Sequence, residues 1–179
     1  MLMRIGAAAR SSGDLPNALG VYRRAAEIAP VDPAPLIAAG EVLLQMGNVN
    51  EAIVSFHAAL VRPGDTHGAQ VGLAKAFLKT GKPELALAPA SAALEASPGD
   101  PKVLLLLGVT RDFAGQHGEA QGYYRDALAR APGDPALTVN LALSLTLSGD
   151  YSNAIGVLDR KSTRLNSSHR SLSRMPSSA

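Results

Sequence analysis

The chain has 179 residues, of which 46% are hydrophobic, 18% are charged and 4% are aromatic, and it contains no cysteine and no tryptophan. This apolar content excludes an intrinsically disordered chain, and the lack of cysteine excludes disulfide frameworks, thiolate zinc sites and cysteine nucleophiles. The scarcity of aromatic residues argues against a stacking platform for single-stranded nucleic acid.

The net charge of +2 comes from the end of the chain. Residues 1–158 contain 12 basic and 14 acidic residues, whereas residues 159–179 contain five basic residues and Asp159 as the only acid. The body of the protein is therefore mildly acidic, and we expect no nucleic-acid partner. No apolar run approaches the roughly 20 residues that span a bilayer, so we expect no membrane span.

Small residues recur at a step of 34 along the chain. The columns are Gly13, Gly47, Gly81, Gly115, Gly149; Ala18, Ala52, Ala86, Ala120, Ala154; and Gly6, Gly40, Ala74, Gly108, Ala142. Several columns that share one period without gaps indicate an array of repeated structural units.

Each period predicts two α-helices. Between successive glycines of the first column lie two stretches of helical apolar spacing, each of about 12–15 residues. The glycine ends the first helix, because glycine readily adopts the left-handed conformation of a helix cap. Prolines such as Pro98 end the second helix, and prolines such as Pro101 fit the first turn of the next one.

These columns resemble the tetratricopeptide repeat family, whose unit is a helix–turn–helix with the same period. The resemblance covers residues 1–158 and implies an all-α fold, an α-solenoid whose units stack into a right-handed superhelix. The predicted units are a partial one over 1–32, complete ones over 33–66, 67–100 and 101–134, and a truncated one over 135–158.

Two parts of the chain depart from the repeat. Pro89 lies inside the second predicted helix of the third unit, where it removes a backbone hydrogen bond, so we expect this helix to kink or to start late. Residues 159–179 lose the register and are rich in serine and arginine, which predicts a disordered, non-native tail. In that case, the natural protein continues beyond Asp159 with more repeat sequence.

No catalytic or metal-binding set emerges from the residues. The histidines His57, His67, His117 and His169 occupy unrelated repeat positions, with no carboxylate or second histidine at ligand spacing. The acidic residues are scattered singly, and the glycines follow the period rather than a phosphate-binding loop. We therefore expect a protein that is not an enzyme and that uses no cofactor and no metal.

The resemblance also implies a concave groove lined by the first helix of each unit. The family's inward-facing positions fall here on Ile37, Glu41, Leu44, Val71, Lys75, Leu78, Lys79, Leu105, Val109, Phe113, Asn140 and Leu143, together with Gln45, Lys102, Leu106, Asp112, Val139 and Leu147. The positions of the family's carboxylate clamp hold mainly Ile, Val, Leu and Ala, which disfavours recognition of a C-terminal carboxylate. Asn140 is the expected polar anchor, and Lys75 and Lys79 are expected to attract an acidic flank.

An apolar groove of this size marks a binding site or a covered face. We expect a non-catalytic scaffold or adaptor whose groove holds a peptide or helix of a partner protein, docked on its leucines. Two alternatives stay open: the groove is covered by a missing domain or by self-association, or its residues belong to a tighter core. A further alternative is a regulatory repeat segment of a larger protein with an enzymatic domain.

A narrower resemblance concerns residues 13–26 and the Leu-Ser-Gly-Asp-Tyr pattern at 147–151. They are similar to the repeats of bacterial tight-adherence (Flp) pilus assembly lipoproteins, which are exported and anchored through a cysteine near their start. This similarity implies a role in pilus or secretion assembly, and a periplasmic or outer-membrane-associated location if an N-terminal signal is missing. As written, without that signal, the chain is expected in the cytoplasm.

Overall fold

The structure is a computed structural model that describes residues 1–159, and all regular structure in this range is α-helical. The helices are α1 (Leu2–Ser11), α2 (Leu15–Ile28), α3 (Ala34–Gln45), α4 (Val49–Leu60), α5 (His67–Lys79), α6 (Pro83–Ala96), α7 (Pro101–Phe113), α8 (His117–Arg130) and α9 (Pro135–Leu147), followed by a helical stretch over 151–159. The predicted all-α fold is confirmed. The prediction of a disordered tail begins at Asp159, which is wrong for that residue because it lies in the helical stretch, and residues 160–179 lie outside the described residues.

Glycine ends the first helix of each pair, as the period predicts. Gly47 has a φ of 83°, a left-handed conformation that residues with side chains rarely adopt. The amide of Asn48 then donates to the carbonyl of Leu43 at 2.9 Å, which closes the end of α3. The other four glycines of this column have φ values between 70° and 83°. Each first helix therefore turns directly into a second helix that packs back against it.

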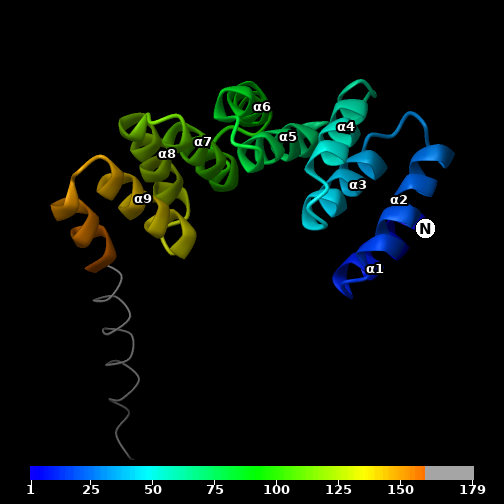
Figure 1. The fold of residues 1–179 in the computed structure, drawn as a ribbon, viewed down its shortest axis with the longest axis horizontal. Helices are drawn as coiled ribbons and strands as arrows, with labels where there is room; N and C mark the ends of the chain where they lie inside the picture. The colour runs from blue at the N-terminus through cyan, green and yellow to red at the C-terminus, as the bar shows by residue number, and fades with distance from the viewer. Residues whose placement is uncertain (160–179) are drawn as a thin grey trace, which may run out of the picture.

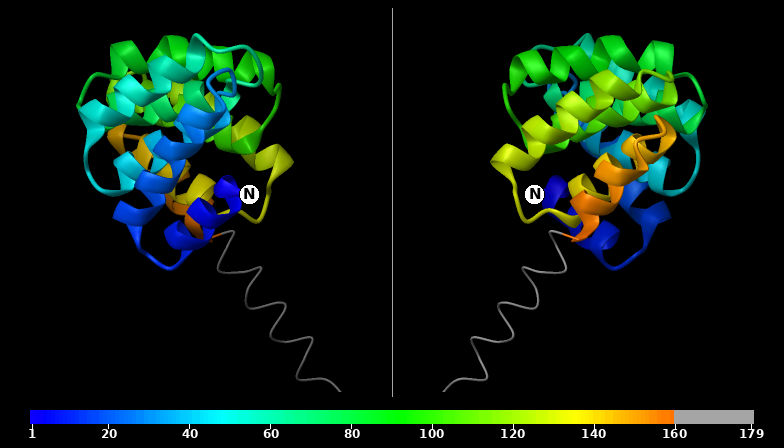
Figure 2. Two further views of the ribbon diagram at one scale, coloured as in Figure 1. Left: turned by 90° about the vertical axis from the view of Figure 1, so that its right-hand side faces the viewer. Right: turned by 90° about the vertical axis from the view of Figure 1, so that its left-hand side faces the viewer.

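The helix pairs stack into an inner and an outer layer. Each helix contacts its neighbours in sequence, and α3, α5, α7 and α9 also contact one another in turn. Among the described residues, the even-numbered helices make no contacts of this extent with each other, so they lie further apart. Figure 1 shows the pairs following one another along the longest axis, and Figure 2 shows them winding around it. The odd-numbered helices from α3 onward form the inner layer of a helical-repeat solenoid.

An aromatic ring packed on a glycine joins the two helices of a pair. Phe56 of α4 is fully buried, and its ring lies so close to Gly40 of α3 that an added Cβ atom would meet it at 2.6 Å. Two other pairs are built in the same way, with Tyr22 on Gly6 and Tyr124 on Gly108. These positions leave no room for a methyl group, because protein interiors are close-packed.

The third pair, α5 and α6, is packed without a ring. Ala74 and Ala90 occupy the glycine and aromatic positions of this pair, and both are fully buried. Leu106 of α7 belongs to the same core cluster and adds apolar volume from the next pair. This pair thus lacks both the ring and the glycine, as expected for two positions whose side chains must be complementary in shape.

Pro89 lies inside α6 without dividing it. The expectation of a late start is wrong, because α6 begins at Pro83 and runs to Ala96. Pro83 itself is compatible with the first turn, where backbone amides have no partner within the helix. A kink at Pro89 stays a prediction.

We predict that Gly40→Ala destabilises the protein, although alanine favours a helix by about 1 kcal/mol over glycine. The added methyl group would overlap the buried ring of Phe56, and overpacking of this kind costs about 1–3 kcal/mol. The measurement is the free energy of unfolding from a urea titration.

Gly20→Ala is the matched control, because Gly20 also lies within a helix but an added Cβ atom there meets nothing within 4 Å. This substitution should raise the free energy of unfolding by up to about 1 kcal/mol. If both substitutions had the same effect, the ring of Phe56 would not limit the space at Gly40.

Candidate functional site

The residues predicted to line a groove all lie on the inner helices α3, α5, α7 and α9. Leu106 is buried, which corrects its placement in the groove, and the other predicted residues are at least partly accessible to solvent. Leu44, Leu78 and Leu105 also pack against buried core clusters, so the alternative of a tighter core describes a part of this set. Phe113 is 62% exposed and Leu143 is 53% exposed, which are high fractions for large apolar side chains. We call the accessible side of these four helices the inner surface. Its role in binding stays a prediction.

The part of the inner surface on α3 is bridged by a side chain of α1. The guanidinium of Arg10 forms an ion pair with Glu41, and its Nε donates to Oε1 of Gln45 at 3.2 Å. Arg10 occupies the repeat position of Leu44, and it was not among the predicted residues. The charge of Glu41 is therefore compensated within the protein.

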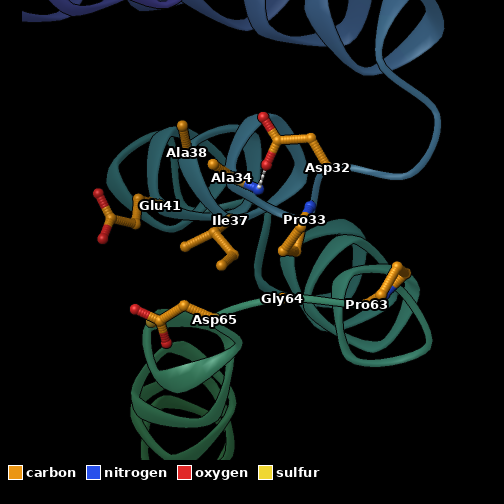
Figure 3. Close-up of a pocket in the computed structure, with 10 residues that line it drawn as sticks. Asp32, Pro33, Ala34, Ile37, Ala38, Glu41, Pro63, Gly64 and Asp65 are labelled. Carbon is orange, nitrogen blue, oxygen red and sulfur yellow. Dashed lines mark hydrogen bonds between the residues drawn. The ribbon is translucent and has the colours of Figure 1, made fainter.

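Ile37 and Glu41 border a depression of about 450 Å³ between α3 and the connection from α4 to α5. Figure 3 shows Ile37 beside the carboxylates of Glu41 and Asp65, with Asp32 above the start of α3. Asp32 accepts the amide of Ala34 at 2.9 Å, and Asp65 accepts the amide of His67 at the same distance. These aspartates have a structural task at the helix starts. Within residues 1–159, no group of three or more His, Cys, Asp or Glu residues is placed to hold a metal ion.

Lys75 and Lys79 project from α5 one helical turn apart, and both are exposed. Within residues 1–159, neither ammonium group forms a hydrogen bond or an ion pair. Their positive charge is therefore available to a partner.

The part of the inner surface on α7 and α9 is largely apolar, apart from the exposed Lys102 at the start of α7. Leu105 and Val109 of α7 are half-buried, while the exposed large side chains are Phe113, Val139, Leu143 and Leu147. Asn140 is the polar residue of this part that was expected to anchor a partner. Its Nδ2 donates to the carbonyl of Ala136 at 2.8 Å, so its amide is oriented by its own helix.

A polar cluster around Asp112 adjoins this apolar part. The carboxylate of Asp112 accepts hydrogen bonds from the Tyr124 hydroxyl at 2.8 Å and from the Ser144 hydroxyl at 2.7 Å. Nδ1 of His117 lies 2.8 Å from the same carboxylate. The sequence did not indicate this contact, which forms because the tight turn at Gly115 brings His117 back to Asp112. The cluster joins α7, α8 and α9 through one partly buried carboxylate.

The cluster is not arranged as a catalytic triad. The hydroxyl of Ser144 donates to Asp112, and within residues 1–159 it forms no hydrogen bond with an imidazole nitrogen. The pKa of Tyr124 is raised far above its ordinary value of 10.0, first by burial and then by the hydrogen bond to Asp112 and the charge of that carboxylate. Tyr124 is therefore a neutral hydrogen-bond donor, and the arrangement is that of a structural joint.

The sequence model of a family described as "Tetratricopeptide repeat" matches residues 37–101 and 105–163. The match covers more than half of the chain, and the structure shows the corresponding stacked helix pairs. The chain belongs to the tetratricopeptide repeat family. Within residues 1–159, no helix combines the length and the apolar character needed to cross a membrane.

Solved structures share this fold. A structure named "MamA 41-end from Desulfovibrio magneticus RS-1" is similar with a TM-score of 0.82 and 22% identity, covering 93% of this chain and 94% of that one. The structure of "YrrB: a TPR protein with an unusual peptide-binding site" has a TM-score of 0.72 and 21% identity, covering 89% of this chain and 82% of that one. At these identities the similarity establishes the fold alone. No curated protein sequence matches the chain, and the narrower resemblance to pilus lipoproteins finds no support.

We predict that the protein loses stability above about pH 10 partly through Tyr124. Tyrosine in the unfolded chain ionises near its ordinary pKa of 10.0, whereas the raised pKa keeps Tyr124 protonated in the folded protein. Its contribution is therefore fully present below pH 10 and is lost as the pH rises further. The free energy of unfolding should fall less between about pH 8 and pH 11 in Tyr124→Phe than in the wild type.

Tyr151→Phe serves as the control, because Tyr151 is exposed and forms no hydrogen bond with its hydroxyl within the part of the chain that the structure describes. This variant should keep the pH dependence of the wild type. Identical pH dependence in all three proteins would contradict the assignment to Tyr124.

Proposed function

We propose that the protein is a non-catalytic interaction scaffold that binds a peptide or helical segment of a partner protein on its inner surface. The observation that carries this proposal is the exposure of large apolar side chains on α7 and α9. Phe113 matters most, because it lies within the array and stays exposed although a further helix pair follows it. Contiguous exposed apolar surface on a protein of this size marks a site of interaction.

Membership in the tetratricopeptide repeat family supports the proposal. The structure named for YrrB is described as having a peptide-binding site, and the two chains share the fold. The Asp112 cluster supports the non-catalytic part, because its serine, histidine and aspartate are not ordered for nucleophilic attack. A place in pilus or secretion assembly rests only on the patterns of residues 13–26 and 147–151 and stays a prediction.

A second candidate function is that of a regulatory repeat segment in a larger protein. It is favoured by the exposed apolar side chains on the helical stretch over 151–159, which include Ile155 and Leu158. Leu158 occupies the repeat position of Tyr124, and that residue is fully buried where α9 follows. A further unit or another domain would cover Leu158 in the same way.

The proposal is tested by selecting a displayed library of random peptides on the immobilised protein. Peptides selected on the wild type should lose about tenfold or more in affinity for Phe113→Glu and for Leu143→Glu, because truncating or charging a buried anchor costs at least about 1.4 kcal/mol. Substitutions at Leu78 and Leu105 are less suitable, because both side chains pack against buried core clusters.

Ile28→Glu is the matched control, since Ile28 is as exposed as Phe113 but lies on the outer helix α2. It should leave the affinity of the selected peptides unchanged. If no peptide were selected, or if binding depended equally on Ile28 and Phe113, the inner surface would not be the binding site.

A further inference from the structure

The chemistry of the inner surface changes along the array. We propose that its partner segment is amphipathic and carries acidic residues at one end and large apolar residues at the other, with the acidic end on α5. This inference rests on the proposed function and specifies the partner of the same site.

On the inner helices, the carboxylates have partners within the protein, whereas two lysine side chains of α5 have none among residues 1–159. Their only carboxylates are Glu41, which is paired with Arg10, and Asp112, which is held in its cluster. The aspartates that precede these helices each accept a backbone amide at the helix start, namely Asp32, Asp65, Asp100 and Asp134. Lys75 and Lys79 have no partner within residues 1–159, so the unmatched charge in the middle of the inner surface is positive.

The apolar part begins one helix further along the array. The inner helix α9 contains no charged residue, and Val139, Leu143 and Leu147 follow one another at four-residue steps along one side of it. Phe113 adds an exposed aromatic ring from α7. This surface offers contacts to apolar side chains and no compensation for a charge.

The two parts lie on one continuous surface, because α5 contacts α7 and α7 contacts α9. Two rows of equivalent repeat positions run across the three helices: Lys75, Val109, Leu143 and Lys79, Phe113, Leu147. A segment that crosses the helices along these rows meets two lysines first and apolar side chains afterwards. Figure 1 shows α5, α7 and α9 in this order along the solenoid.

The spacing of the helices sets the length of the segment. Neighbouring packed helices lie about 10 Å apart, so the path from α5 to α9 covers about 20 Å. A helical segment of about 13 residues has this length. The acidic end of such a segment would then face the lysines of α5, while leucine-like side chains at its other end face the apolar part.

The test selects a displayed library of random peptides of about 16 residues, a length that covers the 20 Å path with a margin at each end. Peptides enriched on the wild type should carry Asp or Glu near one end and Leu, Ile or Phe towards the other. On Lys75→Glu/Lys79→Glu the same library should instead yield peptides in which Lys or Arg replaces the acidic residues. This exchange of charge is the result that a purely apolar site would not produce.

One enriched peptide is then synthesised and titrated against single variants. Lys79→Glu should weaken its binding about fivefold at low salt, with a smaller effect as salt rises, since an exposed ion pair contributes up to about that factor. Lys82→Glu is the control, because Lys82 is also exposed but lies in the turn after α5. It should leave binding unchanged.

Three results would overturn the inference. Enriched peptides that need Phe113 but show no acidic preference would leave the proposed function intact and remove the partner chemistry. A dimer of the protein that Phe113→Glu dissociates would identify a second copy as the occupant. Binding to vesicles of anionic lipid that Lys79→Glu abolishes, with no charge preference among peptides, would identify a membrane surface instead. If no peptide binding depended on the inner surface, the proposed function would fail as well.

Discussion

The contact of an aromatic ring with a glycine is the constraint on which the solenoid depends. Phe56 fills the space between α3 and α4 only because Gly40 has no side chain, and the same ring also lies close to Gly72 of α5. One ring thus fixes the distance within a pair and the distance to the next pair. Ring-on-glycine contacts recur within the pairs α1–α2 and α7–α8, whereas α5 and α6 keep a close approach through buried alanines.

The proposed function depends on which side chains occupy a few equivalent repeat positions. The backbone repeats from pair to pair, while one repeat position changes from Glu41 through Lys75 to Val109 and Leu143. The scaffold therefore keeps its geometry while the surface passes from compensated charge to free positive charge and then to apolar side chains. A repeated fold determines where a ligand can lie, and the variable positions determine its chemistry.

The fold could be predicted from the sequence because its determinants are local and periodic. Gly47 shows where α3 ends, and the 16-residue step from Gly40 to Phe56 lies within one unit. The side chains that modify the candidate site could not be predicted in the same way. Arg10 reaches Glu41 from another pair, and Ser144 reaches Asp112 across 32 positions, so both contacts depend on how the pairs stack. The sequence indicates no partner for Glu41 or Asp112, but the carboxylates of both residues have partners in the structure.

The hydrogen bonds of Asp112 also affect how much conformational entropy the protein loses when a ligand binds. Asp112 precedes Phe113 in the chain, and its carboxylate is held by Tyr124 of α8 and Ser144 of α9. The backbone that carries the exposed ring is consequently fixed relative to α9 before any ligand arrives. A preorganised surface of this kind loses little conformational freedom on binding, so more of the free energy of apolar contact remains as affinity.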